Sequence, residues 1–397
     1  MDIKPVLSCP EIEVGGNYFV KQKTNDFRPA VVLENRINSV TGVLECYVHY
    51  ESTDHRLDEW VNADCVESRS ATEPSTSVNF YLIILRLGLL LLESVASSGI
   101  FSFYFQGSKV KRIEKIIYGD YLIHTWYHSP YPKEYEDCTI LYVCDHCLKY
   151  MMYDYTYVKH RRDCRRIHPP GKEIYRDGSF VLYEVHGNHA RAKVPPTPYC
   201  QCLCYLAKLF IDQKTIFCDL DSFMFYVLCE DQKSSMVGYF SKETGNIDDY
   251  NLACICILPP FQRTGYGKLL IQFSYELSRR EGIVGSPEKP LSDLGKYSYQ
   301  SYWSWALLEV LKRTKKITLE ELSKTTGIHE DDIVACLTDL HMTKYWKGTP
   351  WLRITKTAVE KCYRNGVVKK PRIVLKPNLL HWKAPQFLFS SRTLDLL

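Results

Sequence analysis

The sequence lacks a strong charge imbalance, an internal repeat and a low-complexity tract. Its 50 lysines and arginines are balanced by 46 aspartates and glutamates, so the formal net charge is only +4 over 397 residues. This small excess does not by itself indicate a nucleic-acid-binding protein, although basic runs such as His160-Arg161-Arg162 occur locally. Apolar residues make up 45% of the chain, which excludes general disorder and fits two or three domains.

The first residues of the sequence contain no apolar stretch like the core of a signal peptide. A secreted protein held together by disulfides is therefore not expected. We expect an intracellular protein whose 16 cysteines are reduced thiols or metal ligands.

One apolar run, at residues 78–92, raises the question of a membrane span. As a helix it would cover about 22 Å, less than a hydrocarbon core of roughly 30 Å. Arg86 lies in its middle, where an arginine costs about 2.5–3.5 kcal/mol to insert. We therefore expect no membrane association, and favour a buried or partner-facing helix. A translated remnant of an unspliced intron is a further explanation.

Periodicity divides the chain into regions. Residues 10–67 hold three alternating stretches, GNYFVKQ, RPAVVLENRI and VLECYVHYE, which predict a small bent sheet or barrel. Residues 68–108 form a linker that includes the apolar run. The pattern of apolar residues then predicts a compact region over 109–397, with an α/β part at 174–300. At 302–365 it predicts helices closed by a short β-ribbon.

A metal motif lies within residues 139–170. Cys144-x2-Cys147 is followed, after twelve residues, by His160-x3-Cys164. Four such ligands fit tetrahedral zinc, and because the protein fills every position the role should be structural. We expect the first pair in a tight knuckle and the second pair on one face of a helix. Unrelated cysteines and a DNA-reading finger are the alternatives, but a single finger covers only about three base pairs.

A second motif combines a strand, a glycine loop and a helix. Residues 251–258 are almost continuously apolar, which predicts a buried strand, and helical spacing follows directly after the loop. Gly265 and Gly267 let backbone N–H groups approach a ligand closely, and with the helix N-terminus they form a cradle for a pyrophosphate. Arg263 and Lys268 can add positive charge.

Two familiar phosphate loops do not fit this motif. A Walker loop needs Ser or Thr where Leu269 stands, and a dinucleotide fingerprint needs a third glycine where Leu270 stands. The run from Gln262 to Gly267 instead matches the acetyl-CoA loop of GCN-type acetyltransferases. A plain glycine-rich turn before an amphipathic helix remains the alternative.

With both motifs in place, the chain resembles the MYST family of lysine acetyltransferases over about residues 109–375. The matching stretches are PPGKEIYR (169–176), LAKLFIDQKT (206–215), VGYFSKE (237–243), LPPFQRTGYGKLLIQFSYELS (258–278) and VGSPEKPLSDLG (284–295). Residues 10–67, with YVHYESTDHRLDEWV at 47–61, look like the chromo-barrel domain of the MOF-type and Esa-type branch. SYWSWALLEVL at 301–311 leans toward the MOF type.

The resemblance implies an α+β fold. It consists of a GCN-type acetyl-CoA-binding α/β core at 174–300, a zinc-finger part at 139–170 and a winged-helix-like part at 302–375. A small chromo-like β-barrel at 10–67 precedes them. The implied ligands are acetyl-CoA as co-substrate and a structural zinc ion held by Cys144, Cys147, His160 and Cys164.

The resemblance also assigns roles to single residues. Glu288 is the implied general base, Cys254 lies beside the acetyl group, and Lys208 corresponds to an autoacetylated lysine. The implied cofactor contacts are Ile255, Ile257, Gln262, Arg263, Thr264, Gly265, Tyr266, Gly267, Lys268, Ser292, Ser301 and Lys370.

The chemistry of acetyl transfer agrees with these roles. A lysine amine has a pKa near 10.4, so only roughly one in two thousand is neutral at pH 7 and a base is needed. A carboxylate serves best with its pKa raised toward roughly 6–7. Backbone N–H groups near Cys254 or Ile255 would meet the oxyanion. A buried strand cysteine is usually a small core residue, so covalent catalysis by Cys254 stays open.

Several features depart from the family or stay undecided. Cys256 and Ile257 stand where relatives commonly have Leu and Thr, and Cys202 and Ser222 replace an asparagine and a proline; residues 78–105 have no counterpart.

A chromo-like barrel can hold methyl-lysine in an aromatic cage. The candidates are Tyr18, Phe27, Tyr47, Tyr50 and Trp60, which serve equally well as core aromatics.

The sequence thus predicts a nuclear histone acetyltransferase that regulates chromatin and transcription, with a lysine of the histone H4 tail as substrate. We expect it to act on histone tails or nucleosomes within a multiprotein complex, with RNA or DNA contact through the barrel. A catalytically weakened chromatin scaffold is the first alternative. A zinc-dependent DNA-binding factor is the second, but Glu330, Asp331 and Asp332 would repel phosphate.

Overall fold

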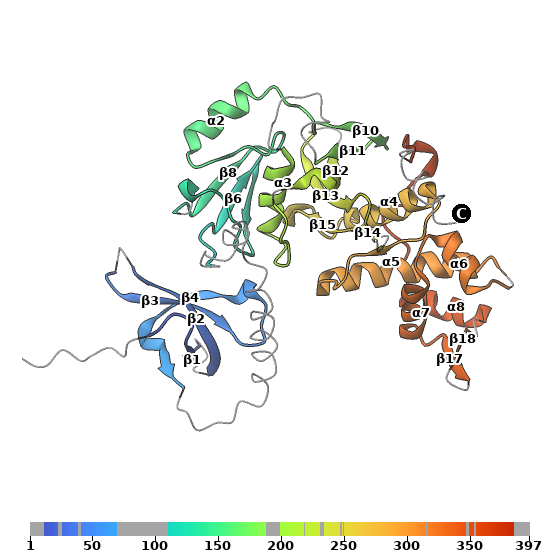
Figure 1. Cartoon of the computed structure of the whole chain (residues 1–397), viewed down its shortest axis with the longest axis horizontal. Coiled ribbons are helices and arrows are strands. Elements are labelled where there is room, and N and C mark those ends of the chain that lie inside the picture. Colours follow the sequence, from blue (N-terminus) through green and yellow to red (C-terminus); the bar gives the residue numbers. More distant parts are fainter. Residues whose placement is uncertain are drawn as a thin grey trace, which may run out of the picture. The chain divides into compact units, whose positions relative to one another are not determined.

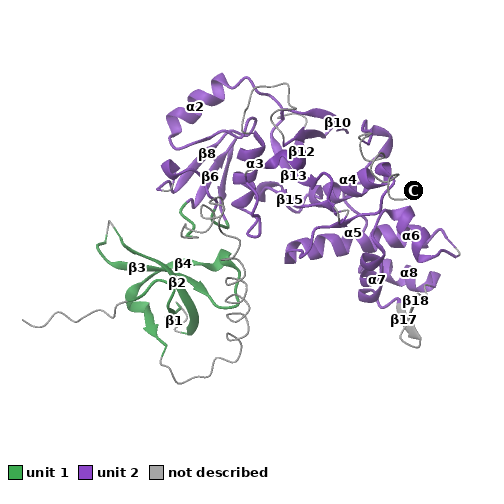
Figure 2. Ribbon diagram, in the orientation of Figure 1, with its two compact units in different colours: residues 1–112, 126–128 green, residues 113–125, 129–397 purple. Residues whose placement is uncertain are grey.

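The computed structural model describes residues 12–22, 26–38, 41–69, 110–135, 137–187, 199–217, 219–230, 234–246, 248, 250–314, 316–346, 349–352 and 355–384. They form two compact units, residues 1–112 with 126–128 and residues 113–125 with 129–397 (Figure 2). The apolar run at 78–92 lies outside the described residues. Among the described helices, none has the length and apolar character needed to cross a membrane.

Unit 1 is built on an antiparallel five-stranded sheet in the order β4-β3-β2-β1-β5 (Figure 1). The strands are β1 (Asn17–Lys21), β2 (Phe27–Ile37), β3 (Leu44–Tyr50), β4 (Glu59–Asn62) and β5 (Val66–Ser68), with the 3-10 turns η1 (His55–Leu57) and η2 (Ala63–Cys65). Alternate side chains such as Val20, Ala30 and Val48 are fully buried and form one core. The predicted small β-rich unit is therefore confirmed.

Unit 2 begins with a small four-stranded sheet in the order β7-β6-β8-β9, which carries one helix. Its elements are β6 (Lys115–Tyr118), β7 (Tyr121–His124), η4 (Lys133–Tyr135), β8 (Ile140–Val143), β9 (Tyr150–Met151) and α2 (Asp154–Asp163). Helix α2 packs against β8 and β9.

The centre of unit 2 is a second five-stranded sheet, in the order β10-β11-β12-β13-β15. Its elements and their helices are β10 (Lys172–Arg176), β11 (Phe180–His186), α3 (Tyr199–Lys208), η5 (Leu220–Ser222), β12 (Phe223–Glu230), β13 (Met236–Glu243), β15 (Cys254–Ile257), η6 (Pro259–Phe261) and α4 (Tyr266–Glu281). Helix α4 packs against β13 and β15, and its apolar side, including Leu269 and Phe273, is fully buried (Figure 1).

The predicted continuous strand at 251–258 was wrong. It is divided into β14 (Tyr250–Leu252) and β15, which belong to different sheets. Strand β14 pairs in parallel with β16 (Ser286–Pro287), while β15 pairs with β13. The division falls at Ala253. The N–H groups of Ala253 and Cys254 both bond to Ser241 of β13, so two residues of one strand lie opposite one residue of the other. This arrangement is a β-bulge.

The C-terminal part contains helices, a β-ribbon and a final extended segment. Its elements are α5 (Asp293–Leu311), α6 (Leu319–Thr326), α7 (Glu330–Asp339), β17 (Thr343–Trp346), β18 (Thr349–Leu352), α8 (Lys356–Arg364) and η7 (Pro377–Leu379). Helix α5 packs against α4, α6 and α7. The extended segment then returns to the core, where Ile373 and Leu375 bond to the side chain of Gln272.

Candidate active site

The four predicted zinc ligands meet at the end of β8. Their ligand atoms all lie within 4.8 Å of one another, with Cys147 Sγ 3.1 Å from His160 Nε2 and Cys144 Sγ 3.9 Å from Cys164 Sγ. Tetrahedral zinc with Zn–S bonds of roughly 2.3 Å requires such separations. The donor set and its geometry therefore fit a structural zinc ion.

The local backbone explains how these ligands converge. The first pair forms the predicted knuckle, in which Leu148 N–H donates to the Cys144 carbonyl at 2.9 Å. The prediction that the second pair shares a helix face was wrong in one respect. His160 lies in the last turn of α2, but Cys164 is the capping residue and has an extended backbone. The chain turns there, which directs the Cys164 thiol back toward Cys144.

A second site lies where β14 and β15 separate. A cavity of about 340 Å³ opens there, and its wall includes Cys254, Ile255, Glu288 and Ser292 from the predicted site. The N–H of Glu288 donates to the Leu252 carbonyl at 2.8 Å. The parallel pairing of β14 with β16 thereby brings the predicted base to the same cavity as the cysteine of β15.

The cavity wall also contains ionisable groups that the sequence analysis did not single out. Lys214, from the loop after α3, is only 6% exposed, and Glu243 ends β13. Partial burial raises the pKa of the Glu288 carboxyl, Glu243 raises it further, and Lys214 opposes both. A carboxyl with a raised pKa beside an open cavity is suited to accept a proton near neutral pH.

Cys254 lies opposite Ser241 across β13 and β15. Burial raises the pKa of the Cys254 thiol and Glu288 adds to this, whereas Lys214 and a hydrogen bond from Ser241 lower it. Ser241 is 2% exposed and lines the cavity, and its hydroxyl accepts the N–H of Cys254 at 3.2 Å. The extra N–H of the bulge is therefore satisfied by a side chain.

Strand β15 forms an edge of the central sheet. The N–H of Leu258 donates to the Val237 carbonyl of β13 at 3.0 Å. In an antiparallel pair, every second residue directs its N–H toward the neighbouring strand. The N–H groups of Ile255 and Ile257 therefore point away from β13. The Ile257 carbonyl also faces outward and accepts a bond from Gln262 at 2.9 Å. The outward N–H groups of Ile255 and Ile257 thus lie on the strand edge that connects the cavity to the glycine loop.

The glycine loop leads directly into α4, as predicted. Gly265 caps the helix with φ of 111°, a region that favours glycine, and Arg263 also has a positive φ of 63°. The Arg263 carbonyl accepts a bond from Arg372 at 2.7 Å, so the C-terminal segment holds the loop from outside. The free N–H groups of the first helical turn and the cations around them suit a pyrophosphate.

Most of the remaining predicted cofactor contacts gather at this loop. Lys268 Nζ lies 2.6 Å from Ser301 Oγ of α5. Burial lowers the pKa of the Lys268 amine, and the nearby positive charge of Lys369 lowers it further. Lys370 adjoins Lys369 near the Arg372 contact. Thr264 donates to the Phe261 carbonyl at 2.6 Å, and Tyr266 and Gly267 begin α4.

Lys208, the predicted modification site, does not line the cavity. It ends α3, and its amine donates to the carbonyl oxygen of Asp212 at 2.5 Å. The lysines that line the cavity include Lys214, six residues further along the chain, and Lys289.

The barrel aromatics do not assemble as one cage in the described residues. Tyr47 and Trp60 are neighbours, with ring centroids 5.1 Å apart. The face of Trp60 is covered by Arg36, whose guanidinium lies 3.9 Å from the ring centroid and pairs with Glu45. Tyr50 belongs to the core, and Tyr18 packs against it. Tyr47 and Tyr50 are thus buried, as the prediction of core aromatics requires, whereas Phe27 is exposed.

Comparison with known proteins decides the family. Residues 168–380 match the MOZ/SAS family, residues 110–164 match the MYST family zinc finger domain, and residues 12–68 match the RNA binding activity-knot of a chromodomain. The first match alone covers more than half of the chain. The chain belongs to the MYST family of histone acetyltransferases.

Curated MYST relatives resemble the chain over most of its length. "Histone acetyltransferase MOF" of Drosophila melanogaster is 48% identical over 284 residues, which are 70% of this chain and 34% of the fly protein. "Putative MYST-like histone acetyltransferase 1" of Oryza sativa is 42% identical, over 85% of this chain and 78% of the rice protein. "Histone acetyltransferase ESA1" of Eremothecium gossypii is 36% identical, over 97% of this chain and 95% of that protein.

Membership of the MYST family confirms the predicted α+β fold, the zinc finger and the chromo-type barrel. It also confirms the class of enzyme, an acetyl-CoA-dependent lysine acetyltransferase with a structural zinc. The chain spans about a third of the length of the fly relative and about four fifths of that of the rice relative.

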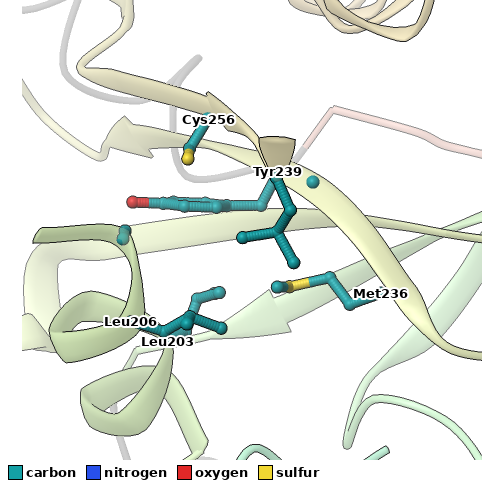
Figure 3. Close-up of a pocket in the computed structure, with 8 residues that line it drawn as sticks. Leu203, Leu206, Met236, Tyr239 and Cys256 are labelled. Carbon is teal, nitrogen blue, oxygen red and sulfur yellow. The ribbon is translucent and has the colours of Figure 1, made fainter. Parts of the chain in front are cut away.

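A closely packed apolar space lies behind β15. Cys256 and Tyr239 point into this space, and Leu203, Leu206 and Met236 lie on its other side (Figure 3). The space is too narrow to admit water. The side chains directly behind the strand of Cys254 therefore pack closely.

Proposed function

We propose that this protein transfers the acetyl group of acetyl-CoA to a lysine ε-amine in a histone tail, with Glu288 as general base. The observation that carries the proposal is the position of Glu288 and Cys254 on one cavity, at the end of an open strand edge that leads to the glycine loop. A MYST chain with this arrangement can hold a nucleoside-linked thioester along β15 and accept an amine from the cavity.

Each residue then has a defined task. Acetyl-CoA supplies the activated acetyl group, and the loop from Gln262 to Lys268 holds its pyrophosphate. Glu288 removes a proton from the substrate ammonium, whose amine is otherwise almost fully protonated near pH 7. The outward N–H of Ile255 meets the developing oxyanion, because that of Cys254 is already bonded to Ser241. Cys254 lines the acetyl pocket.

The proposed substrate is a lysine of the histone H4 tail, in keeping with the resemblance to the MOF type. We further propose a nuclear protein that works on nucleosomes within a multiprotein complex, with RNA or DNA contact through unit 1. The match to an RNA-binding knot of a chromodomain supports that last point. Acetylation of Lys208 remains a prediction by analogy.

The test is acetyl transfer by the full, zinc-loaded chain from radiolabelled acetyl-CoA to the four core histones, with modified lysines identified by mass spectrometry. We expect label on the H4 tail, and none on an H4 tail peptide whose lysines are all replaced by arginine. Label on another histone would overturn the substrate. Binding of acetyl-CoA without transfer to any histone would favour a scaffold instead.

A further inference from the structure

Asp332 connects the segment that carries Glu288 to helix α7. Its side chain is only 5% exposed, although it lies in the first turn of that helix. One carboxylate oxygen accepts a hydrogen bond from Ser286 Oγ at 2.7 Å, and the other pairs with Lys289 Nζ at 2.8 Å. Ser286 lies two residues before Glu288, and Lys289 directly follows it. One buried carboxylate therefore holds the chain on both sides of the proposed base.

The backbone of the same segment is bonded to the turn between α6 and α7 (Figure 1). The N–H of Gly285 donates to the Gly327 carbonyl at 2.8 Å, and the Gly285 carbonyl accepts the N–H of His329 at 3.1 Å. Ile328, between these two partners, is fully buried. These bonds place the N-terminal end of α7 beside β16, so that the first turn of the helix meets the segment that carries the base.

A carboxylate as buried as that of Asp332 needs compensating charge and hydrogen bonds, and its surroundings supply both. Lys289 provides a positive charge from a half-exposed side chain, and Ser286 adds a hydroxyl donor. The first turn of α7 adds the partial positive charge of a helix N-terminus. Because the three side chains satisfy one another, they favour a single arrangement of the segment.

The direction of the Glu288 side chain depends on this support of its backbone. The N–H of Glu288 donates to the Leu252 carbonyl at 2.8 Å. Within the described residues, its carboxyl is influenced by burial and by the charges of Glu243 and Lys214, and not by a hydrogen bond. A general base must lie within about 2.6–3.2 Å of the group that it deprotonates, and a misplacement of about 1 Å can cost about a hundredfold in rate. The backbone on either side of Glu288 therefore decides whether its carboxyl reaches the substrate amine.

We propose that Asp332 is a positioning residue for Glu288, which makes the placement of the base depend on α7 of the C-terminal part. This inference rests on the proposed function, since Asp332 acts only through the base. Loss of the Asp332 carboxylate releases Ser286 and Lys289, and Glu288 then occupies its reactive position for a smaller fraction of the time. The value of kcat falls, whereas the KM for acetyl-CoA is unchanged, because the glycine loop is untouched.

A double-mutant cycle in the full, zinc-loaded chain tests this role. Asp332→Ala is compared in the wild type and in Glu288→Gln, below the melting temperature of every variant. A pH of about 9 leaves enough of the substrate amine neutral for residual transfer to be measured without the base. We expect Asp332→Ala to lower kcat by roughly ten- to a hundredfold when Glu288 is present. Once Glu288 is replaced, the same change should alter kcat by no more than about twofold.

Three further variants sharpen the comparison. Asp332→Asn keeps the shape of the side chain and can still pair with Ser286, so it should recover part of the lost kcat. Asp331→Asn is the matched control in the same helical turn, and it should leave kcat unchanged because the Asp331 side chain is 86% exposed. Ser286→Ala removes one of the two contacts and replaces Asp332→Ala if that variant misfolds. Its smaller fall in kcat should again require Glu288.

Two results would overturn the role of Asp332 and leave the proposed function intact. One is an unchanged kcat in Asp332→Ala, and the other is an equal fall in both backgrounds, which would mean that Asp332 supports the fold as a whole. A Glu288→Gln enzyme within a few fold of the wild type is a different failure. It would remove the general base itself, and with it the need to position that base.

Discussion

Ser241 faces Cys254 across β13 and β15, and its hydroxyl accepts the Cys254 N–H at 3.2 Å. The carbonyl of Ser241 is already occupied by Ala253 N–H at 2.8 Å. The bulge that turns Cys254 toward the cavity thus depends on one serine side chain to satisfy its extra donor. Ser241 is therefore a positioning residue for the strand that we propose lies beside the acetyl group.

We expect Ser241→Ala to destabilise the fold by about 1–3 kcal/mol, since it leaves a buried N–H without an acceptor. It should also raise the pKa of the Cys254 thiol, because the hydrogen bond that lowers it is lost. The measurement is the rate of Cys254 alkylation against pH, followed by peptide mass spectrometry with buried Cys256 as the internal reference. Ser241→Thr should restore both properties. An unchanged alkylation profile in Ser241→Ala would limit Ser241 to a purely structural role.

Lys214 and Glu243 should move the pH dependence of catalysis in opposite directions. Lys214 lowers the pKa of Glu288 and Glu243 raises it. Removing the cation in Lys214→Met should shift the acid limb of kcat/KM to higher pH, because Glu288 then stays protonated up to a higher pH. Glu243→Gln should shift it to lower pH. The two profiles are compared with that of the wild type, and shifts of the same sign would refute this electrostatic account.

The close packing behind β15 predicts a destabilising substitution. The space beside Cys256 is too narrow for water, and therefore also too narrow for the methyl group that Cys256→Val adds. We expect this overpacking to cost about 1–3 kcal/mol, measured as a lower melting temperature. Cys362→Val is the control, since Cys362 is only partly buried and the added methyl group can lie toward solvent. An unchanged melting temperature in Cys256→Val would show that the side chains around Cys256 leave room for a methyl group.

Loss of the finger zinc should unfold the region around α2. The buried cluster there is small and is centred on Cys144, Met151 and Tyr157, so metal coordination supplies much of its stability. Cys147→Ser should lose the zinc ion and melt at a lower temperature. Cys138→Ser should keep the ion, because Cys138 is a buried thiol of the same region that bonds to the Ile140 carbonyl and is not a ligand. Zinc retained by Cys147→Ser would contradict the ligand set.

Local patterns made much of this protein predictable. The knuckle at Cys144 and Cys147, and the passage from β15 through Gly265 into α4, depend on residues close together in the chain. Their spacing and glycine content are sufficient to indicate the geometry. The strands of unit 1 were predictable for the same reason, because their alternation follows one buried face.

The features that were missed depend on contacts between distant segments. The strand at 251–258 is divided because its first half pairs with β16 and its second with β13, and neither pairing is visible in an apolar run. Lys214 reaches the cavity from the loop after α3, whereas Ser241 and Glu243 reach it from β13, so no single motif joins the three. Cys164 follows the end of α2, which the spacing of His160 and Cys164 alone does not reveal.

The most direct test of the central claim is the rate of acetyl transfer to a histone H4 tail peptide, compared between the wild type and Glu288→Gln. Glu243→Gln is the matched control, because Glu243 is the neighbouring carboxyl of the same cavity. If Glu288 is the general base, kcat/KM falls by at least about a hundredfold in Glu288→Gln, with binding of acetyl-CoA unchanged. Glu243→Gln keeps substantial activity with a shifted pH profile. A Glu288→Gln enzyme within a few fold of the wild type would contradict the account and assign the base to another residue.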